Sequence, residues 1–176
     1  GLEPVTVGVG GTNLTVNLTS SGDITSFSII DAPDTPLGFD PDVTVDDLFI
    51  DNTNGTHEDD TVLDINTYAK IEINAGDGSD LLTINNLSPF TGTLDVDGEG
   101  TTGDSITIAG TLTLTGSATL ASETIDVNAA ITANAGITFT TPTTTYLGAN
   151  LQTDGTNVVI NGGTVVVDAA SVVIDT

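Results

Sequence analysis

The sequence predicts an all-β fold, and specifically a right-handed parallel β-helix, from three observations. Two aliphatic residues separated by one other residue recur along the chain, and such short alternation is typical of a strand with one buried face. Gly, Asn, Asp, Thr and Ser fill the gaps between these couplets. The couplets return every ~6 to 20 residues without a helical pattern between them, which indicates a stacked series of short strands. The couplets are Leu48/Ile50, Leu63/Ile65, Ile71/Ile73, Leu82/Ile84, Leu94/Val96, Ile106/Ile108, Leu112/Leu114, Ile125/Val127, Val158/Ile160, Val165/Val167 and Val172/Ile174.

Residues 1–45 are predicted to form an N-terminal cap, or irregular strands that include a proline-rich loop. Pro33, Pro36 and Pro41 lie close together, and proline cannot donate a hydrogen bond to a sheet, so this segment is expected to be a loop or an edge crossing. Glycine-rich turn signals separate the alternating segments, so we expect local, antiparallel pairing here. The expected strands cover residues 5–7, 14–18 and 24–30.

Residues 46–176 are predicted to form the coils of the β-helix. Segments 46–50, 80–84 and 104–108 align without gaps, each with Asp first and aliphatic residues two and four positions later, and segment 123–127 fits with Glu first. Residues two apart lie on one face of a strand, so stacked segments would form one wall of a core with acids at the strand entrances. A second couplet follows in most coils, which gives coils of roughly 19 to 24 residues.

A parallel β-helix fits this pattern because each coil of such a fold contacts only its neighbours. The right-handed form follows from the general preference of parallel crossover connections. A β-sandwich or jelly roll is the alternative, since it also joins short strands by Gly and Asp turns.

The charge of the chain is strongly negative. It has 25 acidic residues, one Lys and no Arg, and a formal net charge of −24; 20 of the acids lie in residues 1–104 and 5 in residues 105–176. Such a surface repels nucleic acid and anionic membranes, and it attracts cations. There is no Cys, which excludes disulfides and thiol chemistry, and no apolar run approaches the ~18 residues of a transmembrane helix.

The segment 75–83 resembles the calcium-binding nonapeptide of RTX proteins, with Gly76, Gly78, Asp80 and Leu82 at the required positions. A degraded copy covers residues 97–106, and a weaker one covers residues 54–60. The resemblance implies turns whose carbonyl and carboxylate oxygens bind calcium. The candidate ligands in these segments are Asp77, Asp80, Asp97, Glu99, Asp104, Asp59 and Asp60.

Residues 105–176 resemble filamentous-haemagglutinin-type and other large bacterial exoprotein β-helices. Short aliphatic strands alternate there with Gly, Asn, Ala and Thr corners. The resemblance implies a secreted adhesin or surface fibre built of many modules. The aliphatic pattern continues to Ile174 without a polar cap, and an open last coil recruits other strands. We therefore expect either a following module or a second copy to dock there.

An enzyme is not expected. Lys70 and His57 are the only basic side chains, aromatic residues are few, and Asp95 and Asp97 form a pair of a kind that every such wall offers. His57 is expected to be an exposed turn residue.

The expected function is therefore a calcium-stabilised structural module of an extracellular fibre or adhesin, which self-associates or joins neighbouring modules. The alternative is a monomeric passenger domain that binds carbohydrates or another surface, including glycans of a host or cell. Neither function involves nucleic acid or insertion into a membrane.

Overall fold

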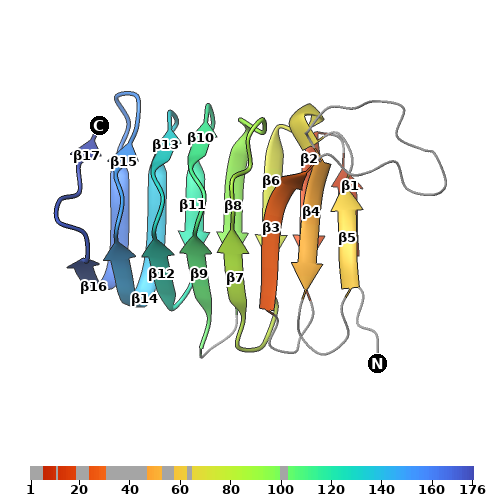
Figure 1. Cartoon of the computed structure of the whole chain (residues 1–176), viewed down its shortest axis with the longest axis horizontal. Coiled ribbons are helices and arrows are strands. Elements are labelled where there is room, and N and C mark those ends of the chain that lie inside the picture. The colour runs from red at the N-terminus through yellow and green to blue at the C-terminus, as the bar shows by residue number, and fades with distance from the viewer. Residues whose placement is uncertain are drawn as a thin grey trace.

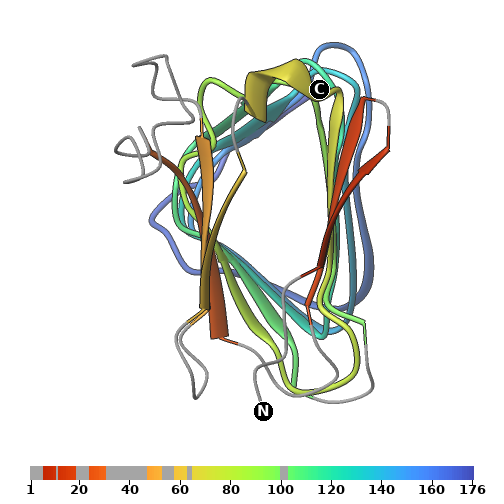
Figure 2. The same ribbon diagram turned by 90° about the vertical axis from the view of Figure 1, so that its right-hand side faces the viewer.

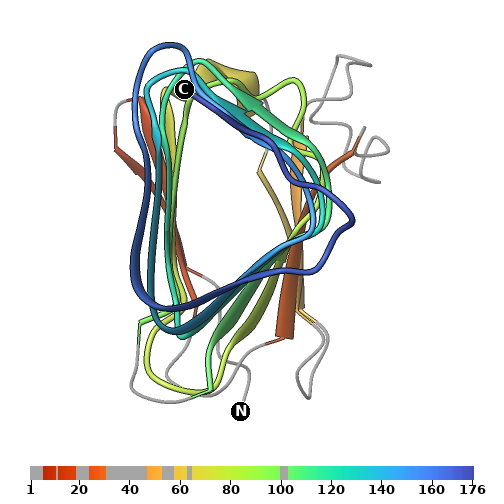
Figure 3. The ribbon, with the colours of Figure 1, turned by 90° about the vertical axis from the view of Figure 1, so that its left-hand side faces the viewer.

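A computed structural model of the chain describes residues 6–10, 12–18, 24–30, 47–52, 58–62, 65–99 and 103–176. It is a β-solenoid of about five turns, in which strands of successive coils pair mainly in parallel (Figure 1). The predicted parallel β-helix is confirmed, and the alternative β-sandwich is wrong. Viewed along the solenoid axis, the coils superpose into one closed outline (Figures 2 and 3).

Three walls, each made of parallel strands from successive coils, form this outline. Because β14 and β16 are long and bend between walls, each contributes to both the first wall and the second. The first wall contains β2 (Asn13–Asn17), β6 (Lys70–Asn74), β8 (Thr93–Asp97), β11 (Ala118–Ala121) and the first parts of β14 (Ile137–Leu147) and β16 (Val158–Val167). The second wall contains β3 (Ile24–Ile30), β7 (Leu81–Ile84), β9 (Ser105–Ile108), β12 (Thr124–Val127) and the second parts of β14 and β16. The third wall contains β10 (Leu112–Leu114), β13 (Ile131–Ala133), β15 (Leu151–Gln152) and β17 (Ile174–Asp175).

The register of the second wall confirms the predicted coil length and the stacking of like residues. Leu82 pairs with Ile106, and Ile106 pairs with Ile125, so successive couplets form one column. All three side chains are buried. The alternation of buried and partly exposed positions along β7, β9 and β12 follows directly from the period of two residues in a strand.

Antiparallel strands close the N-terminal end of the solenoid. β1 (Thr6–Gly10) pairs with β2, and β4 (Asp47–Asn52) lies antiparallel between β3 and β5 (Glu58–Val62). The short 3-10 helix η1 (Ile65–Thr67) precedes the first wall strand β6. The expected antiparallel pairing near the N-terminus is thus present. The sheet also joins the two predicted parts of the chain, because β3, which precedes residue 45, pairs with β4 and β7, which follow residue 46.

One part of the predicted alignment is wrong. The alignment predicts that segment 46–50 stacks in the same column as segment 80–84, but its described part in β4 runs antiparallel to β3. β3 takes the predicted place instead, because Ile24 pairs in parallel with Leu81. The couplet Leu48/Ile50 is nevertheless buried, since a strand keeps its apolar face inward whichever way it runs. Leu63 and His57 lie outside the described residues.

The core is a column of thin aliphatic layers. Leu, Ile and Val from the three walls fill it, together with Phe27, Phe90 and Phe139. The exception is the last coil, where Val165, Val167 and Ile174 are 47%, 56% and 49% exposed. Their counterparts one coil earlier, such as Leu147 beneath Val167, are buried. No helix among the described residues is long and apolar enough to cross a membrane.

We predict that an identical truncation has different effects in the middle and at the end of this column. Ile125→Ala removes a fully buried side chain from the second wall, so it should lower the free energy of unfolding by about 2–5 kcal/mol. Ile174→Ala, at a half-exposed position, should cost less than about 1 kcal/mol. Urea unfolding of both variants at low protein concentration checks this, and equal losses would contradict the solenoid core described above.

Candidate functional site

The corner between the first and second walls carries most of the predicted metal ligands, and we name it the acidic corner. It comprises residues 75–80, 97–99, 103–104 and 122–123, which lie in three successive coils. Asn74 pairs with Asp97 at one side of the corner and Leu81 pairs with Ser105 at the other. The RTX-like segment and its degraded copy are therefore stacked one coil apart.

Carboxylates connect the coils at this corner. Asp104 Oδ1 accepts a hydrogen bond of 2.9 Å from the backbone N–H of Asp80, in the preceding coil. Glu123 Oε2 accepts one of 3.0 Å from the N–H of Asp104, and another from the N–H of Gly103. Each of these two carboxylates thus satisfies backbone donors in the turn of the coil before it. Asp80 is fully buried and Asp104 is 3% exposed.

Burial and like charges act on Asp104. Desolvation raises the pKa of this carboxyl above its ordinary value, and the negative charges of Glu123 and Asp97 raise it further. The hydrogen bond from the Asp80 N–H acts in the opposite direction, because it favours the ionised form. The net direction is upward, so the folded protein binds a proton at Asp104 more readily than the unfolded chain does.

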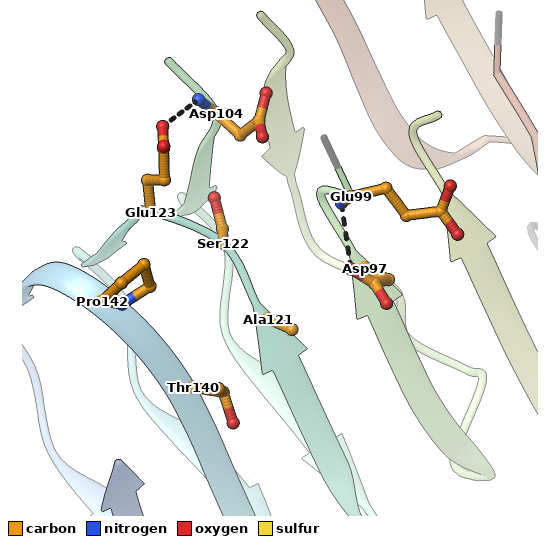
Figure 4. A pocket seen from close by; sticks show the side chains of 8 residues that line it. All are labelled: Asp97, Glu99, Asp104, Ala121, Ser122, Glu123, Thr140 and Pro142. Atoms are coloured by element: carbon orange, nitrogen blue, oxygen red, sulfur yellow. Dashed lines mark hydrogen bonds between the residues drawn. The ribbon is translucent and has the colours of Figure 1, made fainter. Parts of the chain in front are cut away.

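A groove of about 190 Å³ opens at the acidic corner (Figure 4). On one side of it, Asp97 Oδ1 accepts a hydrogen bond of 2.9 Å from the N–H of Glu99, which has a positive φ of 43°. Ser122 is 8% exposed, and its Oγ is buried without a hydrogen-bond partner among the described residues. The lining consists of Asp97, Glu99, Asp104, Ala121, Ser122, Glu123, Thr140 and Pro142. The groove is therefore rich in oxygen atoms and carries several negative charges.

The seven predicted ligands do not come together at one point. Asp97, Glu99 and Asp104 line the groove, whereas Asp77 is exposed in the preceding turn. Asp59 and Asp60 lie in β5, in the antiparallel strands of the N-terminal end. Within the part of the chain that the structure describes, no three acidic or histidine side chains are arranged to hold a metal ion.

Sequence reasoning missed five residues of the groove, of which Ser122 and Glu123 belong to the acidic corner. Glu123 did align with Asp80 and Asp104 as the first residue of its segment, which was the signal that could have identified it. It was overlooked as a ligand because the RTX-like pattern requires glycines, and the short turn before Glu123 has none.

Lys70 neutralises acids on the outer face of the first wall. Its Nζ lies 3.0 Å from Asp95 Oδ2 and 3.5 Å from Glu72 Oε2, and these acids occupy paired positions in β6 and β8. The hydrogen bond to Asp95, together with the charges of both acids, raises the pKa of Lys70 against the opposing effect of burial. Asp95 is thus part of an ion-paired cluster on the outer face, and this observation gives no support to an Asp95/Asp97 catalytic pair.

Comparison with known proteins found no relative of this chain. No protein-family model matches the chain, no curated protein matches it, and no solved structure matches it. The resemblances to RTX turns and to exoprotein β-helices therefore stay predictions. What can be concluded about function depends on the geometry of the acidic corner and of the two ends of the solenoid.

We predict that Asp104→Asn stabilises the protein at neutral pH. The amide keeps an oxygen that can accept the Asp80 N–H bond, and it removes a buried charge beside Glu123 and Asp97. The pKa of Asp104 is raised in the folded state. The free energy of unfolding of the wild type therefore rises as the pH falls from neutral toward the ordinary pKa of an aspartate carboxyl. The advantage of the variant should therefore shrink as the pH is lowered, which urea unfolding between pH 7 and pH 4 would show.

Asp154→Asn is the matched control, because it removes one exposed carboxylate outside the groove. It should change stability little at any of these pH values. If Asp104→Asn is instead less stable than the wild type throughout, the negative charge itself holds the corner together.

Proposed function

We propose that this protein is a structural module of a secreted surface fibre or adhesin, in which another solenoid coil covers the C-terminal coil and calcium supports the acidic corner. The module assembles with its own kind or with neighbouring modules, and it works outside the cell. It has no catalytic role in this proposal.

The observation that carries this proposal is the uncovered last coil. Val158, Ile160, Val165 and Val167 stack on the inward-facing positions of β14, and in a continued solenoid the next coil would bury them. Val165 and Val167 are about half exposed instead. Full burial of a Val or Ile side chain contributes about 1.5–3 kcal/mol, so covering this row with a further coil is strongly favourable.

The negative charge supports the calcium part of the proposal. The acidic corner places Asp97, Glu99, Asp104 and Glu123 around one groove, and the chain has a single Lys to balance 25 acids. Calcium prefers carboxylate and carbonyl oxygens, and its binding tolerates irregular geometry. A cation at this corner would offset the burial and the repulsion that together raise the pKa of Asp104.

A monomeric glycan-binding domain is the second candidate. A wide groove of about 480 Å³ on the outer face offers hydroxyl and amide groups, including those of Thr156 and Asn157. Its lining contains no aromatic residue, and it offers no stacking surface for a sugar ring. This candidate predicts a saturable ligand and no self-association.

Self-association separates the two candidates. In sedimentation velocity and negative-stain electron microscopy, the structural module should form concentration-dependent assemblies through the last coil, with calcium and with chelator compared. A protein that stays monomeric at every concentration, under both conditions, would contradict the proposed assembly and favour the glycan-binding domain.

We further predict that calcium raises the melting temperature and that a chelator lowers it. Calcium at 100 times its dissociation constant would stabilise the folded state by about 2.7 kcal/mol, which corresponds to a rise of about 5–11 °C for a domain of this size. Differential scanning calorimetry at constant ionic strength measures it, with sodium chloride replacing calcium in the reference.

Two double variants locate the effect. Asp97→Asn with Glu99→Gln should reduce the calcium-induced rise, because both residues line the groove. Asp154→Asn with Asp168→Asn makes the same change in net charge outside it and should retain the rise. An equal response of both variants would mean that calcium acts by general screening, and no response in the wild type would refute the metal role.

A further inference from the structure

The free edge of β16 exposes backbone hydrogen-bonding groups. β16 pairs with β14, and no other described strand pairs with it. Elsewhere in the solenoid, inward-facing residues donate their N–H groups to the next coil: the N–H of Ile137 bonds to the carbonyl of Asn157 at 3.1 Å, and that of Leu151 to the carbonyl of Val173 at 3.0 Å. By the same rule, the N–H groups of the inward-facing residues of β16 point off the end of the solenoid.

The sequence of β16 reads nearly the same in both directions. It is Val-Val-Ile-Asn-Gly-Gly-Thr-Val-Val-Val, and its centre falls between Gly162 and Gly163. The bend between the first and second walls lies at the same point, where β14 has its register shift between Thr141 and Thr144. The two halves of β16 are thus similar in sequence and lie on two different walls of the coil.

This symmetry makes β16 complementary to itself. In an antiparallel pair centred on Gly162 and Gly163, Val158 lies opposite Val167 of the second copy, and Ile160 lies opposite its Val165. All four residues face inward, so each pair meets the requirement that residues directly opposite each other lie on the same face of a sheet. All four also direct their N–H groups to the free edge, so these pairs can exchange two backbone hydrogen bonds each.

Glycine is required at the centre of this edge. A Cβ on Gly162 would lie 2.2 Å from the carbonyl oxygen of Thr141, and a Cβ on Gly163 would lie 2.1 Å from that of Thr143. Gly162 also has a φ of 102°, which favours glycine. The pair therefore fixes the bend that divides β16 into its two equivalent halves.

Charge distinguishes the two ends of the solenoid. β16 contains no ionisable side chain, whereas the edge strand β5 begins with Glu58, Asp59 and Asp60. A head-to-tail contact would place this acidic segment beside β16 of another copy, which offers no positive charge to balance it. A tail-to-tail contact joins two strands that carry no charge themselves, although Asp168 and Asp175 lie in the same coil. It keeps the two acidic ends farther apart than the screening length of ~8–10 Å at physiological salt.

We propose that β16 pairs with β16 of a second copy, antiparallel and about a two-fold axis, so that two solenoids join at their C-terminal coils. The inference rests on the assembly proposed above and names its partner. Such an isologous contact closes after two copies. It covers Val165 and Val167, together with the exposed Val173 and Ile174 of the same last coil.

Engineered cysteines test this register, because the chain has no Cys. Val159 and Val166 face outward on β16. In the proposed dimer, Val159 of one copy lies opposite Val166 of the other, at a pair that exchanges no backbone hydrogen bonds. The Cα atoms of such a pair are about 4.5 Å apart, a distance that a disulfide can span. In Val159→Cys with Val166→Cys, most of the protein should become a covalent dimer under mild oxidation, as seen on a non-reducing gel. In each single variant the cysteine faces a valine, so both should stay largely uncrosslinked, and mixing the two should restore the covalent dimer.

A register control and a surface control complete the test. Val159→Cys with Thr164→Cys also has two cysteines on β16, but in the proposed register neither cysteine lies opposite a cysteine of the second copy. This variant should therefore give little covalent dimer. Val167→Asp should convert the wild-type dimer to a monomer in sedimentation velocity, whereas Thr113→Asp, exposed on β10 away from both ends, should leave the dimer intact.

The outcomes separate this inference from the proposed function. Open-ended filaments without a crosslink between positions 159 and 166 would overturn the tail-to-tail pairing and leave the assembling module in place. A wild type that is monomeric at all concentrations would overturn both, and would mean that any cover for β16 comes from a further solenoid coil of a longer chain. A dimer with equal crosslinking in the register control would refute the proposed register.

Discussion

Burial of one coil by the next is the interaction on which this structure depends. A single coil of three short strands cannot bury its own aliphatic residues, because its interior stays open above and below until neighbouring coils cover it. The column from Leu82 through Ile106 to Ile125 is fully buried because it has coils on both sides. The same kind of residue at Val165 is half exposed because it has a coil on only one side. The stability of the fold and the exposure of the apolar row in the last coil therefore have one physical origin.

The acidic corner shows how a strongly negative chain tolerates this stacking. Asp104 and Glu123 satisfy backbone donors of the preceding coil, so their burial is compensated by charge-assisted hydrogen bonds. The compensation is incomplete, since the pKa of Asp104 stays raised by burial and by its acidic neighbours. A bound cation would relieve this repulsion. The corner is thus the place where calcium would have most effect on the stability of the module.

The corner also changes along the axis, and this change gives the two ends different properties. Buried hydroxyls of Thr141 and Thr145 replace the carboxylates in the coil after Glu123, and they bond to each other at 2.7 Å. In the last coil the corner consists of Gly162 and Gly163. Negative charge is therefore concentrated toward the N-terminal end, where antiparallel strands also close the fold. At the C-terminal end the edge strand β16 is uncharged and its apolar row is partly exposed, although Asp168 and Asp175 lie in the same coil.

The sequence alone determined the fold class, the length of the coils and the inward-facing residues, because the period of two within a strand and the repeated couplets are local properties of the chain. It also placed the acids at the strand entrances, and it indicated an open last coil. Only the tertiary structure decided which segments stack: β3 occupies the place predicted for segment 46–50, since antiparallel pairing with β3 keeps Leu48 and Ile50 buried equally well. It likewise showed that the Asp80 N–H and the Asp104 carboxylate form a hydrogen bond between coils, and that Ser122 and Glu123 belong to the groove. These properties depend on which residues lie one coil apart, and coil length varies with each turn, so sequence spacing alone could not fix them.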